Sequence, residues 1–356
     1  GTQAAASEDG SWTNTDDGKV YVADTAEDET VGKVIEVQNL GDSKLVAGLH
    51  TIPCRVKKGE FAPGWLGYYM NSDLFHNQIL PYITGIKVSS ISKGAISETL
   101  ILVPPFDEQE KIVQSLNKIQ LLMTAETKVV NKIKLVKNGC LSKMFPQKDD
   151  TVPEMRLPGF TEAWEQRKLG ELAEIVGGGT PSTSVELYWD GDIDWYAPAE
   201  IGEQIYLKSS QRKITEEGLN KSSAKVLPAG TVLFTSRAGI GKTAILLKEG
   251  CTNQGFQSIV PNKNKLDSYF IFTRSEELKR YGETVGAGST FVEVSGKQMA
   301  NMELMMPTTM DEQQKIGEYF SNLDNLITLH QCKCDKYSNI KKGMMSDLLT
   351  GKIRLV

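Results

Sequence analysis

At 356 residues, with 40% hydrophobic and 24% charged residues, the chain has the size of two or three domains and the composition of an ordinary globular protein. No apolar run approaches the roughly 20 residues that a membrane-spanning helix needs. The five dispersed cysteines lack the spacing of a disulfide framework or a zinc site, so we expect a cytoplasmic protein without membrane contact, metal or cofactor. The net charge of −5 argues against a protein that coats nucleic acid irrespective of sequence, but it is compatible with a sequence-specific reader.

The first part of the chain divides into a polar leader and a strand-rich module. Residues 1–17 are acidic and low in complexity, and we expect them to lie outside any domain or to have been introduced by cloning. Residues 18–105 contain short β-branched and aromatic runs between Gly, Asn and Asp turns, which predicts strands. Arg55, Lys57 and Lys58 form the densest basic cluster of this module and are candidate DNA contacts.

A long helix is predicted over 106–150, and the chain repeats it over 308–356. The sequence Asp-Glu-Gln-Glu-Lys-Ile at 107–112 returns as Asp-Glu-Gln-Gln-Lys-Ile at 311–316. Prolines precede both starts, and Asp107 and Asp311 are placed to cap the helix N-termini. The repeat extends backwards, because Gly18–Val22 parallels Gly230–Phe234 and Leu102–Pro104 parallels Met305–Pro307.

Both helices carry a seven-residue period, with apolar seam positions alternating four and three residues apart. We expect the two helices to pair as an antiparallel coiled coil. Glu126 and His330 fall near the middle of each helix, where they either face each other as a buried polar pair that fixes the register or turn to solvent. The predicted interface consists of Ile112, Leu116, Ile119, Met123, Glu126, Val130, Ile133, Ile316, Phe320, Leu323, Ile327, His330 and Tyr337.

The second module, residues 151–307, offers the fuller set of DNA-binding candidates. Base edges are read by Arg, Lys, Asn and Gln, whereas phosphates are held by Lys, Arg, Ser, Thr and backbone N–H groups. Taken singly, each candidate is more often a solvated surface residue or a turn residue than a DNA contact, and the aromatic residues between 188 and 196 are expected in the core. The candidates are Thr180, Ser182, Lys208, Arg212, Lys213, Arg237, Lys242, Asn253, Gln254 and Gln257.

Several segments resemble the specificity subunits of type I restriction–modification systems. Pro153–Phe160, Trp164–Gly170 and the Gly-Gly-Gly-Thr-Pro-Ser run at 177–182 resemble the opening of a target-recognition domain of that family. The repeated Asp-Glu-Gln-x-Lys-Ile helix starts resemble its two spacer regions, and Leu348–Ile353 resembles its C-terminal end.

The resemblance implies an α+β protein with two mixed α/β target-recognition domains separated by the paired helices. It implies double-stranded DNA as ligand, with methyltransferase (modification) subunits and a restriction endonuclease/translocase subunit as partners, and no catalysis in this chain. The domains would be residues 18–105, 106–150, 151–307 and 308–356. The first recognition domain is much shorter than the second, so we expect it to be a truncated form whose DNA reading is in doubt.

Two look-alike motifs define the enzymatic alternatives. Ala238–Thr243 resembles the end of a P-loop, but Ser236 occupies the position of its first glycine, and a glycine-rich turn between strands is the competing interpretation. Val103–Phe106 resembles the catalytic tetrapeptide of amino-methyltransferases, but valine offers no acceptor for the target amine. An NTPase or a methyltransferase therefore has less support than a bipartite DNA reader. A scaffold that binds methyltransferase subunits without reading DNA is the other alternative.

Overall fold

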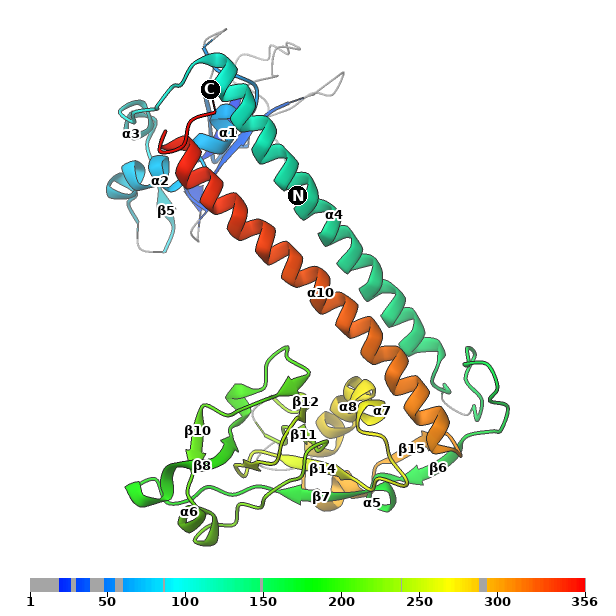
Figure 1. The fold of residues 1–356 in the computed structure, drawn as a ribbon. Coiled ribbons are helices and arrows are strands. Elements are labelled where there is room, and N and C mark those ends of the chain that lie inside the picture. Colours follow the sequence, from blue (N-terminus) through cyan, green and yellow to red (C-terminus); the bar gives the residue numbers. More distant parts are fainter. Residues whose placement is uncertain are drawn as a thin grey trace. The chain divides into compact units, whose positions relative to one another are not determined.

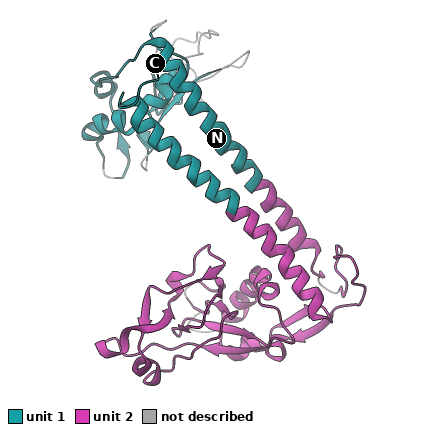
Figure 2. Cartoon of the chain, viewed as in Figure 1, with its two compact units in different colours: residues 1–130, 329–356 teal, residues 131–328 magenta. Residues whose placement is uncertain are grey.

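The computed structural model describes residues 19–26, 30–38, 48–54, 60–85, 87–147, 150–237, 239–287 and 293–355. The chain forms two compact units, shown in Figure 2: unit 1 comprises residues 1–130 and 329–356, and unit 2 comprises residues 131–328. Each unit combines a module of strands and short helices with one end of each of two long helices (Figure 1). The fold class is therefore α+β, as predicted.

Unit 1 is built on an antiparallel sheet in the order β3-β1-β4. Val20 and Val22, on the same face of the central strand, are fully buried against Trp65, Phe75 and Ile79 of the two helices that cover this face. The elements are β1 (Val20–Ala23), β2 (Thr25–Ala26), β3 (Val34–Glu36), β4 (Thr51–Cys54), α1 (Trp65–Tyr69), α2 (Asp73–Ile79), a 3-10 turn (Leu80–Tyr82), β5 (Ser89–Ser90), which pairs with β2, and α3 (Lys93–Ser97).

Unit 2 contains a larger mixed sheet whose described strands run in the order β7-β14-β11-β12-β9. Smaller sheets have the orders β10-β8-β13 and β15-β6. The elements are β6 (Glu165–Lys168), α5 (Leu169–Leu172), β7 (Ala173–Gly177), a 3-10 turn (Glu186–Tyr188), β8 (Trp189–Tyr196), a second 3-10 turn (Pro198–Glu200), β9 (Tyr206–Leu207), β10 (Arg212–Ile214), α6 (Glu216–Asn220), β11 (Val232–Phe234), β12 (Thr243–Leu246), β13 (Cys251–Thr252), β14 (Gln257–Pro261), α7 (Ser268–Thr273), α8 (Ser275–Gly286), α9 (Gly296–Ala300) and β15 (Glu303–Met306).

The central strand β11 explains why this module has a core on both faces of the sheet. Val232 and Phe234 pack on one side with Phe270 of α7, while Leu233 packs on the other side with Tyr196 and other buried side chains. The order β12-β11-β14 in unit 2 matches β3-β1-β4 in unit 1, and all of these neighbours are antiparallel. The sequence parallel between Gly18–Val22 and Gly230–Phe234 thus corresponds to equivalent central strands.

The long helices are α4 (Phe106–Lys143) and α10 (Met310–Leu349). The predicted N-cap roles of Asp107 and Asp311 are wrong, because both residues lie inside the first turn. Thr309 performs the capping at α10, where its Oγ1 accepts the N–H of Glu312 at 3.3 Å. The spacing Thr-x-x-Glu is itself a capping-box signature that the sequence carried.

The glutamates of the repeated Asp-Glu-Gln motif form equivalent buried ion pairs in the two units. Glu108 and Glu312 are buried, with exposures of 4% and 1%. Glu108 accepts two hydrogen bonds from the guanidinium of Arg354, at 2.7 and 2.6 Å, which hold the pKa of this carboxyl below its usual range. Glu312 accepts two from Arg156, both at 2.8 Å. Each bidentate pair ties the start of one long helix to the segment that follows the other.

The polar contacts between α4 and α10 also repeat in the two units. In the sequence repeat, position 120 corresponds to 324 and position 137 corresponds to 341, so the two contacts below are equivalent. In unit 1 the Nζ of Lys341 donates to Gln120 at 2.8 Å. In unit 2 the Nζ of Lys137 donates to Asp324 at 2.6 Å. In both units the contacting residues run in opposite directions along α4 and α10, so the helix segments are antiparallel. All thirteen predicted interface residues are buried or half-buried.

Glu126 and His330 contact each other in unit 1 through Oε2 and Nδ1, and each side chain is less than one-fifth exposed. A half-buried polar pair in an apolar seam penalises shifted registers, in which one partner would stay unpaired. We therefore expect Glu126→Leu together with His330→Leu to leave the helices folded but to broaden the distance distribution between spin labels on α4 and α10. Thr124→Leu with Gln331→Leu, at exposed positions, is the matched control. An unchanged distribution in the first variant would rule out the register role.

Candidate nucleic-acid interface

A glycine turn at the end of β7 brings two loops of unit 2 into contact. A Cβ atom on Gly178 would lie 2.0 Å from the carbonyl oxygen of Asn253 and 2.3 Å from that of Thr252. The N–H of Gly179 donates to the Thr252 carbonyl at 2.9 Å. Only glycine allows this approach, so the turn is a structural requirement that fixes where the following residue, Thr180, can lie.

Thr180, Asn253 and Gln254 meet at this contact. The Oγ1 of Thr180 donates to the side-chain oxygen of Gln254 at 2.6 Å, although 74 residues separate them. The Oδ1 of Asn253 accepts the N–H of Gly255 at 2.8 Å, which folds the loop into a tight turn. Gln254 is exposed, and its amide nitrogen has no partner among the described residues. Two residues able to recognise adenine therefore stand side by side with a hydroxyl.

Gln257 and Arg237 extend the same cluster. Gln257 begins β14 and lies opposite Gly177 of β7. The N–H of Ser236 donates to the Gly255 carbonyl at 2.8 Å, so the next residue, Arg237, lies beside the Asn253 turn. Its guanidinium pairs with Glu293 at 2.7 Å, and it remains 45% exposed. We call Thr180, Arg237, Asn253, Gln254 and Gln257 the loop edge of unit 2.

The P-loop look-alike belongs to the same hairpin as Arg237. It connects the antiparallel strands β11 and β12, and Gly239 and Gly241 both have a φ of +97°. A phosphate-binding P-loop joins a strand to a helix, so the interpretation as a glycine-rich turn between strands is confirmed. Lys242, at the end of this turn, is exposed, and its N–H donates to Thr235 Oγ1 at 2.9 Å.

The other predicted residues of unit 2 lie outside the loop edge. The guanidinium of Arg212 stacks 3.6 Å from the centre of the Trp189 ring, and Lys213 Nζ is 3.9 Å from Asp194. Lys208 is exposed after β9. Ser182 uses its carbonyl to accept the indole N–H of Trp189 at 3.1 Å. No described hydrogen bond or ion pair links these four residues to the loop edge.

Sequence reasoning missed the charge pair formed by Asp194 of β8 and Lys248, which follows β12. Asp194 is only 2% exposed. Its carboxylate accepts hydrogen bonds from the N–H and the hydroxyl of Ser210 and forms an ion pair with the Nζ of Lys248 at 2.5 Å. Burial raises its pKa, but the bonds from Lys248 and Ser210 outweigh burial, so the pKa of Asp194 lies below its usual range. Burial also raises the pKa of the Cys251 thiol to about 12. No local pattern around Lys248 or Asp194 reveals this partnership, because 54 residues of chain separate them.

In the first module, the predicted cluster Arg55, Lys57 and Lys58 lies outside the described residues. The predicted core role of the aromatic residues in unit 2 is confirmed for Trp189, Trp195 and Tyr196, which are at most 7% exposed. The indole N–H of Trp195 donates to the Gly179 carbonyl at 2.8 Å, so this buried side chain helps to fix the glycine turn.

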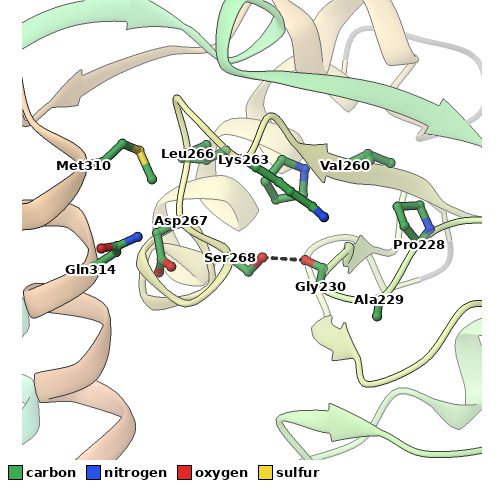
Figure 3. A pocket seen from close by; sticks show the side chains of 11 residues that line it. Pro228, Ala229, Gly230, Val260, Lys263, Leu266, Asp267, Ser268, Met310 and Gln314 are labelled. Atoms are coloured by element: carbon green, nitrogen blue, oxygen red, sulfur yellow. Dashed lines mark hydrogen bonds between the residues drawn. The ribbon is translucent and has the colours of Figure 1, made fainter.

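Unit 2 also contains a small cavity of about 180 Å³ near the start of α10 (Figure 3). Its polar groups already serve the fold, because Asp267 accepts the N–H of Phe270 at 2.8 Å and Ser268 donates to the Gly230 carbonyl at 2.7 Å. None of the predicted DNA-binding residues lines it. In the described ranges, no group of three His, Cys, Asp or Glu residues is placed to hold a metal ion, and no helix is long and apolar enough to cross a bilayer.

The chain is similar to several known proteins. Residues 161–336 match the family model described as type I restriction modification DNA specificity domain. The chain is similar to the type I restriction enzyme MjaIX specificity subunit of Methanocaldococcus jannaschii, with 37% identity over 46% of this chain and 38% of that protein. The putative MjaX specificity subunit of the same organism is 26% identical over 95% of this chain and 79% of that protein.

The fold is similar to that of the type I restriction–modification system S subunit from M. genitalium. The TM-score is 0.65 at 14% sequence identity, covering 94% of this chain and 83% of that one. The match to the MjaIX relative thus spans less than half of either protein, whereas the fold similarity extends over most of both chains.

Proposed function

The chain belongs to the family of type I restriction–modification DNA specificity subunits, and on this premise we propose that it is the sequence-reading subunit of such a complex. In this role it binds double-stranded DNA, catalyses no reaction itself, and works in the cytoplasm with methyltransferase and endonuclease/translocase subunits. The observation that carries the proposal is the loop edge of unit 2. Residues from three separate loops converge at the loop edge, and their side chains have the donors and acceptors needed to read bases.

The chemistry of the loop edge suits base reading better than phosphate binding. Asn253, Gln254 and Gln257 present amides, which pair with adenine at two points, and Arg237 is suited to guanine. The three amides carry no charge, so they add specificity rather than general affinity for the DNA backbone. Lys208, Arg212, Lys213 and Lys242 are then expected to hold phosphates on either side of the bases.

We also propose that α4 and α10 form an antiparallel coiled coil that separates two recognition domains, residues 18–105 and 151–307. The equivalent seam contacts in the two units support this arrangement, because each unit pairs the beginning of one helix with the end of the other. The apolar and half-buried seam makes the pair a rigid spacer. Its outer faces are the proposed docking surface for two methyltransferase subunits.

The decisive experiment maps methylated bases in cells that contain this chain and its methyltransferase partner. We expect a bipartite motif, and we expect Gln254→Ala or Arg237→Ala to relax one position of the half-site read by unit 2. The loss of one paired contact costs about 1–3 kcal/mol of discrimination between bases. Gln166→Ala and Arg167→Ala, in β6 and outside the loop edge, are matched controls that should leave the motif unchanged. An unchanged motif in all four variants would remove the loop edge from the reading role.

The alternative of a scaffold without DNA reading draws on the small sheet of unit 1. Its described part has the order β3-β1-β4, where unit 2 adds β7 and β9 on either side of the equivalent strands. A stable complex with methyltransferase subunits that methylates no site would favour this alternative. Binding of ATP or S-adenosylmethionine to the isolated chain would instead favour one of the enzymatic readings.

A further inference from the structure

The loop edge of unit 2 contains an ion pair, and only its arginine was among the predicted DNA-binding residues. The Nη2 of Arg237 lies 2.7 Å from the Oε1 of Glu293, and the two side chains are 45% and 33% exposed. In the described ranges neither side chain has a further hydrogen-bond or ion-pair partner. A carboxylate in contact with a guanidinium suited to guanine changes what that guanidinium can bind.

The backbone holds both members of this pair at one buried contact. The N–H of Val294 donates to the Ser236 carbonyl at 3.1 Å, and the N–H of Ser236 donates to the Gly255 carbonyl at 2.8 Å. Val294 and Ser236 are both fully buried. Because Arg237 follows Ser236 and Glu293 precedes Val294, both charged side chains extend from the same fixed part of the fold. Their proximity is therefore a property of the backbone.

Stability does not account for this pair. Ion pairs between exposed side chains add little to the free energy of unfolding, since water and salt screen them. In this respect the pair differs from Arg156 and Glu312, which are 11% and 1% exposed. At a surface that binds DNA, a carboxylate also lowers affinity, because it repels phosphates. The pair is therefore better explained by what it recognises than by what it stabilises.

Together the two side chains present hydrogen-bond donors beside an acceptor. A guanidinium carries five N–H donors, and the contact with Glu293 leaves most of them available. In the major groove, guanine presents two acceptors, N7 and O6, and its cytosine partner presents the N4 donor. An adenine–thymine pair presents an acceptor, a donor and an acceptor in that order. Donors from Arg237 beside an acceptor from Glu293 therefore complement a guanine–cytosine pair.

We propose that Arg237 and Glu293 read one guanine–cytosine base pair as a unit, so that Glu293 is a specificity-determining residue. The guanidinium donates to N7 and O6 of guanine. The carboxylate holds the guanidinium through Oε1 and accepts the N4 amine of cytosine through Oε2. Because the carboxylate offsets the charge of the guanidinium, Arg237 is directed to a base rather than to phosphates. The inference rests on the proposed function and assigns a base pair to one part of the loop edge.

The test uses the complex of the full chain with its methyltransferase subunits. In the mapped motif, Glu293→Ala should relax the same position that Arg237→Ala relaxes, and the parent motif should have a guanine–cytosine pair there. At that position the preference over adenine–thymine, measured by fluorescence anisotropy, should fall at least about tenfold. For duplexes without the motif, the plot of log affinity against log salt should steepen by about 0.9 in Glu293→Ala, because Arg237 is freed to bind one phosphate.

Glu171→Ala is the matched control, because its carboxylate also pairs with an arginine at 2.7 Å, Arg167, and lies outside the loop edge. This variant should keep the parent motif and salt dependence. Circular dichroism should be unchanged in both variants, since Glu293 and Glu171 are partly exposed.

Three outcomes would overturn the proposal. The first is a parent motif without a guanine–cytosine pair at the position that Arg237→Ala relaxes. The second is a Glu293→Ala variant that keeps the parent motif although Arg237→Ala relaxes it. The third is tighter binding of every duplex with no position relaxed, which would mean that Glu293 only repels phosphates. If Arg237→Ala and Gln254→Ala also leave the motif unchanged, the reading role of the loop edge itself fails, so the two failures are distinguishable.

Discussion

Replacement of Arg156 by methionine is expected to lower the free energy of unfolding of unit 2 by about 3–5 kcal/mol. The substitution leaves the carboxylate of Glu312, which is 1% exposed, without its bidentate partner. The indole N–H of Trp164, at 3.2 Å, is then its remaining described side-chain donor, and one neutral donor does not compensate a buried charge. Urea unfolding followed by circular dichroism measures the loss.

Two further variants test this explanation. Arg156→Met combined with Glu312→Gln removes the buried charge and keeps an acceptor for Trp164, so most of the stability should return. Arg354→Met breaks the equivalent pair in unit 1, where the arginine is 50% exposed and water can replace it, so the loss should be clearly smaller. If Arg156→Met and Arg354→Met cost the same, burial would not be what makes the pair in unit 2 important.

A methyl group on Gly178 is expected to weaken DNA binding at least about tenfold and to lower the free energy of unfolding by about 1–3 kcal/mol. The atoms that Cβ would meet are the carbonyl oxygens of Asn253 and Thr252, which belong to backbone and cannot swing aside. The turn must then move away from the Asn253 loop, and the hydrogen bond between Thr180 and Gln254 is lost. The affinity is measured by fluorescence anisotropy with DNA that contains the mapped methylation motif.

Gly177→Ala is the matched control for this variant. Its Cβ would have the end of the Gln257 side chain as nearest neighbour, at 3.7 Å, which is an ordinary contact. We expect this variant to bind DNA with unchanged affinity. Equal affinities for Gly177→Ala and Gly178→Ala, both at the parent value, would show that the glycine turn does not position the reading residues.

The repeated helix motif illustrates how far local sequence carries the prediction of this fold. Heptad spacing predicted two long helices, and α4 and α10 begin within one residue of the predicted Asp-Glu-Gln starts. The capping role of Asp107 and Asp311 was wrong, because α4 and α10 begin one residue earlier. The buried glutamates of the motif bind arginines that the repeat alone does not identify. Arg156 lies 156 residues from Glu312, and Arg354 lies 246 residues from Glu108.

The DNA-binding candidates show what the sequence alone could not predict, namely which of these residues lie together. Residue type alone placed Arg212 and Arg237 in the same class, although one stacks on Trp189 and the other stands beside the Asn253 turn. The amide residues were named from their chemistry, but their convergence depends on a glycine turn that packs against a loop more than 70 residues away. Lys248 was missed because its partner, Asp194, is brought near by sheet pairing.

The sequence by itself indicated the resemblance to type I specificity subunits, the α+β class and the doubled helix, because periodicity and repeated motifs can be read along the chain. Only the tertiary structure decided which polar residues form the loop edge and which charges neutralise each other in the interior. Those properties depend on contacts between segments far apart in the chain. Burial and hydrogen-bond geometry select such contacts, and no short stretch of sequence encodes them.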